Sequence, residues 1–143
     1  MRRVLSAWLD NCGSKFIDSG KPAVGELFYK LATTVEPQGS VPWYNLGLHT
    51  KSTGRWSESL RFNQHALELD PTDEAAWWNL GIASTALRNC SEARRAWKAC
   101  GIELEDAEGE VRMPAVTACV RLDPSGSGEV VWGQRLDPAR MAI

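Results

Sequence analysis

The chain has 143 residues, 43% of them hydrophobic and 24% charged, with a formal net charge of −2. This length fits one domain, and this composition is typical of a folded protein in water. The charge gives no long-range positive field to attract nucleic acid or anionic lipid. No apolar run is long enough to cross a bilayer. We therefore expect neither a nucleic-acid partner nor a membrane partner.

Cysteine and histidine are sparse and scattered. The four cysteines contain no C-x-x-C pair, and His49 and His65 stand apart from them. We predict no metal site, no cofactor and reduced thiols in the cytoplasm, with Cys12, Cys90 and Cys100 on buried helix faces. Both histidines are expected on solvated helix surfaces, and no serine or cysteine nucleophile is placed beside them by a motif. The chain is therefore not predicted to be an enzyme.

An internal repeat with a period of 34 residues organises most of the chain. The segments 43–47 and 77–81 share the pattern W-x-x-L-G at this offset, and Gly20 and Gly54 are related in the same way. Such a period is the sequence signature of stacked repeats. In chain order, the three copies cover about residues 6–39, 40–73 and 74–107.

The first copy is degenerate, because Leu9 stands where the later copies have tryptophan, although Gly13 and Pro37 are kept. In the second copy, apolar residues at helical spacing predict two helices, over 43–53 and 56–69. Each repeat is thus predicted to be an antiparallel helix pair. In the first two copies a glycine suits the turn, and an X-Pro step stops the second helix. The predicted helix caps are Ser57, Ser91 and either Thr72 or Asp73.

This pattern resembles the tetratricopeptide repeat (TPR) family, whose signature is W-x-x-L-G followed by a small residue, an alanine and a closing proline. The copy with Trp43, Ala66 and Pro71 matches it well. The resemblance covers about residues 6–107 and implies a mainly α, right-handed superhelical stack of three helix-turn-helix repeats. It also implies that Trp43 and Trp77 lie in the core. Gly47 and Gly81 cost stability within a helix, so we expect a neighbouring helix to approach closely there.

The tail, residues 108–143, has a different character. Residues 116–122 and 129–136 are rich in β-branched residues, and the dense turn signal of 123–128 separates them. We predict a linker and a short C-terminal β-hairpin. An isolated hairpin is marginal in water. It is therefore expected to pack on the helices, to pair with another chain or to begin a truncated second domain, and the apolar ending favours the last.

The candidate site is the concave face that the first helix of each repeat lines in the family. Asn11, Asn45 and Asn79 share one repeat position and would form a ladder that holds an extended peptide backbone. Alternatively, their amides only tie adjacent repeats. The other candidate peptide-binding residues beside this row are Tyr44, Leu48, Lys51, Trp78 and Ile82. The alternative is that Tyr44 and Trp78 belong to the core.

Family members that serve heat-shock chaperones hold a C-terminal carboxylate with lysine, arginine and asparagine. Asn45 suits such a clamp, but Ala75 and Asn79 stand where the cations would be, and the first repeat has Asp10. The sequence departs from the clamp pattern, so binding of a chaperone C-terminus is not favoured.

The leading hypothesis is a protein-binding scaffold or adaptor with a protein or peptide partner. One alternative is an N-terminal docking or regulatory module of a larger protein whose β domain carries the activity. Another is a homodimer formed through the uncapped third repeat, whose exposed face would carry Trp97, Cys100 and Leu104.

Overall fold

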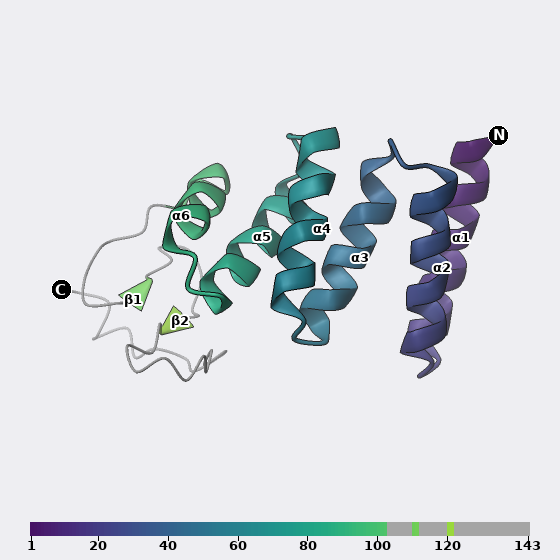
Figure 1. The fold of residues 1–143 in the computed structure, drawn as a ribbon, viewed down its shortest axis with the longest axis horizontal. Coiled ribbons are helices and arrows are strands. Elements are labelled where there is room, and N and C mark those ends of the chain that lie inside the picture. Colours follow the sequence, from purple (N-terminus) through teal and green to yellow (C-terminus); the bar gives the residue numbers. More distant parts are fainter. Residues whose placement is uncertain (103–109, 112–119, 122–143) are drawn as a thin grey trace.

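A computed structural model of the chain describes residues 1–102, 110–111 and 120–121. In this part of the chain, six helices follow one another as three pairs along the long axis (Figure 1). The helices are α1 Arg2–Asp18, α2 Pro22–Val35, α3 Ser40–Ser52, α4 Trp56–Leu69, α5 Glu74–Ala86 and α6 Cys90–Ala99. The fold is mainly helical, as the sequence predicts.

Two short strands follow the helices. β1, Glu110–Val111, pairs antiparallel with β2, Val120–Arg121. The second predicted strand, 129–136, and the predicted turn lie outside the described residues, so the C-terminal hairpin stays a prediction.

The turns inside the helix pairs keep the 34-residue period. Gly20, Gly54 and Arg88 hold the equivalent place, and all three have a positive φ, of 77°, 73° and 58°. Glycine adopts this left-handed geometry without steric cost, whereas arginine does not. The third repeat therefore builds the same turn from a less suitable residue.

Side-chain caps are present in the third repeat. Asp73 accepts hydrogen bonds from the backbone N–H groups of Ala75 and Ala76 at the start of α5, as predicted. Asn89, and not Ser91, caps α6. Ser57 lies within the first turn of α4, which has no side-chain cap.

The glycine of each W-x-x-L-G position receives a side chain from the second helix of its pair. A Cβ built on Gly13, Gly47 or Gly81 would lie 2.7, 2.4 or 2.8 Å from the nearest atom. The atoms met belong to the equivalent residues Tyr29, Asn63 and Trp97. The close approach predicted at Gly47 and Gly81 is confirmed.

Trp97 is buried within the third repeat and is not part of an open face. It is 1% exposed, and its Nε1 donates to Thr85 Oγ1 at 3.0 Å. The prediction that Trp97 lies on an exposed end of the stack was wrong, because the ring fills the space that Gly81 leaves. Leu104 lies outside the described residues.

The signature tryptophans join each pair to the one before it. Trp43 Nε1 donates to Pro37 O at 3.1 Å, and Trp77 Nε1 donates to Pro71 O at 2.9 Å. Both rings pack against the core cluster but stay half-buried. Their assignment to the core was therefore correct in part only. An indole buries its body and keeps its N–H on a partner.

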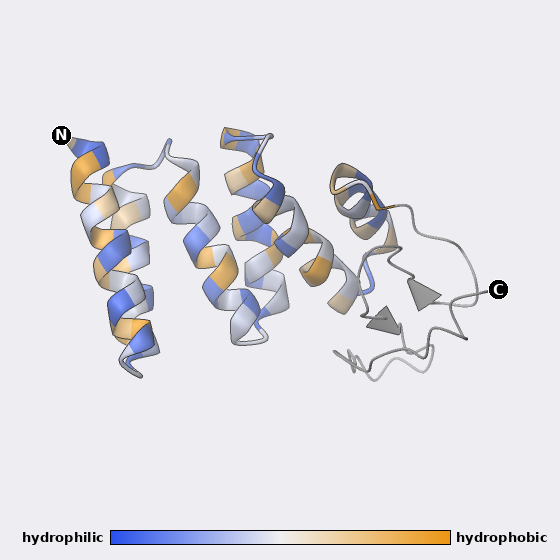
Figure 2. Cartoon of the chain, turned by 180° about the vertical axis from the view of Figure 1, so that it is seen from behind, coloured by the Kyte–Doolittle hydropathy of each residue, from blue (hydrophilic) through white to orange (hydrophobic). Residues whose placement is uncertain are grey.

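Apolar packing continues from one pair to the next. Ala66 and Leu67 of α4 form one buried cluster with Ala76 and Leu80 of α5 and Ala96 of α6. Figure 2 shows hydrophobic and hydrophilic residues intermixed along the helices, as expected where each helix buries one side and exposes another. Since a single pair cannot bury its apolar side alone, stacking completes the core.

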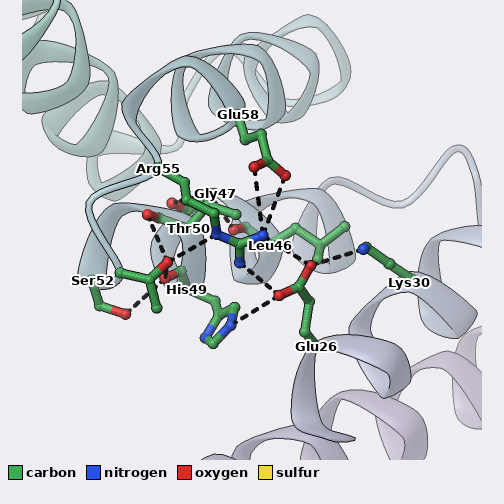
Figure 3. A network of polar contacts seen from close by, with 10 residues as sticks. Glu26, Lys30, Leu46, Gly47, His49, Thr50, Ser52, Arg55 and Glu58 are labelled. Atoms are coloured by element: carbon green, nitrogen blue, oxygen red, sulfur yellow. Dashed lines mark hydrogen bonds and ion pairs between the residues drawn. The ribbon is translucent and has the colours of Figure 1, made fainter. Parts of the chain in front are cut away.

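A polar network joins the first two pairs (Figure 3). Glu26 of α2 forms ion pairs with Arg55 at 2.6 Å and Lys30 at 2.8 Å, and its Oε2 lies 3.3 Å from His49 Nε2. Hydrogen bonds from Arg55 are the main cause that lowers the pKa of Glu26 to about 2. His49 is 5% exposed. The predicted exposure of His49 was wrong, because the imidazole lies against Glu26 and Tyr29 of the preceding repeat.

Candidate functional site

The first helices of the three pairs form one face of the stack. α1 contacts α3, and α3 contacts α5, while each second helix also packs on the first helix of the next pair. All the residues predicted to bind a peptide lie on these three helices. They are Asn11 on α1, Tyr44, Asn45, Leu48 and Lys51 on α3, and Trp78, Asn79 and Ile82 on α5.

The three asparagines have different environments. Asn11 is exposed, Asn45 is half-buried, and Asn79 is 2% exposed. Asn79 Oδ1 accepts a hydrogen bond of 2.7 Å from Lys51 Nζ. Asn11 and Asn45 can therefore reach a ligand. Asn79 ties α5 to α3, which is the alternative that the sequence left open.

Lys51 and Tyr44 of the neighbouring helix α3 both interact with Asn79. Burial lowers the pKa of the Lys51 ammonium. Burial also raises the pKa of the Tyr44 phenol, with a smaller contribution from Asp73, while a hydrogen bond to Asn79 opposes the rise. These groups form a polar cluster at the junction of the second and third repeats.

The apolar residues of the strip are only partly accessible. Leu48 is 38% exposed and Ile82 is 8% exposed. Trp78 is half-buried and meets Trp97 edge to face at 5.2 Å. Tyr44 is half-buried against the core cluster. Leu48, Tyr44 and Trp78 thus keep some accessible apolar surface, while Ile82 belongs to the buried cluster on which Trp78 packs.

A cleft of about 750 Å³ opens between the first helices of the first two repeats. Its walls come from α1, the α2–α3 connection, α3 and the end of α4. The polar residues among its lining are Arg3, Ser6, Asp10, Asn11, Ser14, Glu36, Gln38, Ser40, Asn45 and Asp70. The cleft brings Asn11 and Asn45 to one site, but Asn79, the third residue of the predicted ladder, does not line it.

Asp10 is the buried ionisable group of this cleft. Its side chain is almost fully buried, and its Oδ1 has no hydrogen-bond partner among the described residues. Burial raises the pKa of Asp10, a hydrogen bond from Asn45 opposes the rise, and the nearby Glu36 adds to it. The site therefore holds a carboxyl group whose ionised form is poorly compensated.

Sequence analysis did not find the cleft itself, because its walls include the α2–α3 connection and the end of α4. Ser6 and Glu36 were not singled out. The repeat alignment carries one signal, since Asp10 occupies the position of Tyr44 and Trp78. A carboxylate thus replaces an aromatic ring at the first repeat.

Within the described ranges, no three His, Cys, Asp or Glu side chains gather closely enough to hold a metal ion. None of the helices there has the length and apolar character needed to cross a membrane. Cys12 and Cys100 are half-buried free thiols. Cys90, predicted to be buried, is exposed at the start of α6.

Comparison with family models and with curated proteins finds no match. Among solved structures, the chain is similar to the second TPR domain of Spaghetti (RPAP3) bound to the HSP90 peptide SRMEEVD. The TM-score is 0.64 and the identity 18%, over 67% of this chain and 89% of that one. The first TPR domain of the same protein, bound to the same peptide, gives a TM-score of 0.62 and 19% identity over 67% and 78%. The chain therefore has a fold similar to that of these tetratricopeptide repeat domains.

Proposed function

We propose that the chain is a non-catalytic scaffold that holds a peptide segment of a partner protein in the groove of α1, α3 and α5. The observation that carries this proposal is the cleft between α1 and α3. There Asn11 and Asn45 lie beside buried polar atoms that have no partner among the described residues. The two TPR domains of similar fold hold a peptide, which supports the same use of the fold here.

In this proposal the groove residues have different tasks. Asn11 and Asn45 offer amide donors and acceptors to an extended peptide backbone. Tyr44, Leu48 and Trp78 provide apolar contact area for a side chain of the peptide. Lys51, Asn79 and Ile82 hold this surface in place, and Lys51 does so through its hydrogen bond to Asn79.

The finer features of the sequence interpretation belong to the same proposal. They are the right-handed twist of the stack, the repeat bounds 6–39, 40–73 and 74–107, and a cytoplasmic location. No nucleic acid is needed as a partner, since the net charge is −2.

The test is selection from a peptide display library against the whole chain. We expect enriched peptides whose binding is weakened at least tenfold in an Asn45→Ala, Trp78→Ala double variant that stays folded by circular dichroism. Arg61→Ala, an exposed change on α4, is the control and should bind as the unmodified chain does. Equal binding of selected peptides to the double variant would exclude this groove.

A further inference from the structure

The cleft between α1 and α3 contains more acidic than basic groups. Asp10, Glu36 and Asp70 line it, against the single guanidinium of Arg3. Arg3 is paired with Glu36 at 3.3 Å, and its own side chain is 92% exposed. This guanidinium is therefore committed to Glu36 at the solvent edge and leaves Asp10 uncompensated.

Asp70 does not change this balance. Its Oδ1 accepts hydrogen bonds from the hydroxyl and the backbone N–H of Thr72, at 2.6 and 3.0 Å. These donors are neutral, so they stabilise the carboxylate without neutralising its charge. They also lower the pKa of Asp70, the hydroxyl contributing most.

Two buried polar atoms lack a partner in this cleft. Asp10 is 8% exposed, and its Oδ1 is unpaired among the described residues. Ser6, one helical turn earlier on α1, is 1% exposed, and its Oγ is also unpaired there. Residues four apart lie on the same side of a helix. Unpaired buried groups of this kind are unfavourable unless a ligand satisfies them.

Helix dipoles do not favour an anion here. Ser40 and Val41 at the amino end of α3 line the cleft, but so do Leu69 and Asp70 at the carboxyl end of α4. The partial charges of these two helix ends have opposite sign, so they oppose each other. The carboxylates therefore decide the sign of the site.

We propose that this cleft binds a basic side chain, lysine or arginine, of the peptide held in the groove. Asp10 serves as its counter-ion, and Ser6 Oγ accepts one of its N–H hydrogen bonds. Glu36 and Asp70 add negative potential at the rim. The inference rests on the proposed function, because it names the chemistry of the ligand that the groove selects.

The proposal is tested on the whole chain with short blocked peptides, followed by nuclear magnetic resonance. Acetyl-Gly-Lys-Gly-amide should shift the signals of Ser6, Asp10 and Asn45, and should bind at least tenfold more tightly than acetyl-Gly-norleucine-Gly-amide. Norleucine has the same aliphatic stem without the ammonium group. Gly-norleucine-Gly-amide, with a free amino terminus, distinguishes a terminal ammonium from a basic side chain.

Asp10→Asn should weaken binding of the lysine peptide at least tenfold. Asp18→Asn is the matched control, since it makes the same chemical change on an exposed part of α1 outside the cleft. Ser6→Ala provides a second variant, with an expected loss of about threefold. Equal binding of the lysine and norleucine peptides, or full binding to Asp10→Asn, would overturn the inference.

The two proposals fail in different ways. If the selected library peptides bind through Asn45 but contain no basic residue, the proposed peptide groove is supported and the proposed site for a basic side chain is contradicted. If no selected peptide depends on Asn45, the groove itself is wrong. In that case, binding of the lysine peptide would show only a local site for a cation and not a peptide-binding groove.

Discussion

The ionised carboxylate of Asp10 lowers the stability of the folded chain when no peptide is bound. Its raised pKa means that the folded state holds its proton more tightly than the unfolded state does. Ionisation of Asp10 therefore destabilises the folded chain above its folded pKa, and this cost disappears as the pH falls below the unfolded value.

We expect Asp10→Asn to raise the free energy of unfolding at pH 7 by up to about 1 kcal/mol in the absence of peptide, because it removes a buried charge. The difference from the unmodified chain should vanish in acid, where Asp10 is protonated in both states. Urea denaturation at pH 7 and pH 3 measures this. A destabilised variant at pH 7 would mean that the carboxylate has an ionic partner at rest.

Gly81 shows the opposite situation, in which a residue of poor helix propensity improves packing. Alanine would be better for the helix by about 1 kcal/mol. However, its Cβ would lie 2.8 Å from the rigid ring of Trp97, which is fully buried.

Gly81→Ala should therefore lower the free energy of unfolding by about 1–3 kcal/mol through overpacking. Urea denaturation followed by tryptophan fluorescence measures the change. A more stable variant would show that the Trp97 ring can move aside at little cost.

These residues also show what the sequence could and could not predict. The close approach at Gly81 follows from the repeat itself, since glycine recurs within a helix at a fixed offset. The burial of His49 could not be predicted from the repeat. It involves a contact with Glu26, which belongs to another repeat, and this histidine–glutamate pair does not recur at the 34-residue offset. The cleft was missed for the same reason, since its walls combine a loop and helix ends.

Glu26 holds α2 against α3 and the start of α4. Its side chain is 14% exposed, and its pKa is lowered from 4.5 to about 2, chiefly by Arg55. A lowered folded pKa contributes stability that is present above pH 4.5 and is lost as the pH falls toward 2.

Glu26→Gln should destabilise the chain by about 1–2 kcal/mol at pH 7, a moderate value because Arg55 is partly exposed. The unmodified chain should lose this advantage between pH 4.5 and 2, and the variant should not. Thermal denaturation across this range measures it. Parallel pH curves for the two chains would contradict the assignment.

The turn between α3 and α4 offers a test of backbone geometry without packing effects. Gly54 has a φ of 73°, and nothing lies within 4 Å of a Cβ built there. Gly54→Ala should therefore cost about 1 kcal/mol from the left-handed conformation alone. Urea denaturation checks this, and an unchanged midpoint would mean that the turn readjusts.

At the scale of the whole molecule, the fold is shared with peptide-binding domains but the charges in the groove are not those of the chaperone clamp. By the family resemblance, Ala75 and Asn79 stand where the clamp would have cations, Asn79 is bonded to Lys51, and the first repeat carries Asp10. An anionic C-terminus would thus meet a carboxylate at the first repeat.

We expect the peptide SRMEEVD to bind this chain at least 100-fold more weakly than a library-selected peptide does, because like charges disfavour the complex. Isothermal titration calorimetry at low salt measures both. Comparable affinity, lost in the Asn45→Ala variant, would show that the groove accepts acidic termini after all.

The hydrogen bonds of the Trp43 and Trp77 indoles limit where residues can be inserted into the chain. Each donor belongs to one repeat, and each acceptor, at Pro37 or Pro71, closes the repeat before it. The bond therefore spans the connection between two repeats, and it forms only when the segment between the proline and the tryptophan has the right number of residues. Insertions are tolerated least in the segments 38–42 and 72–76.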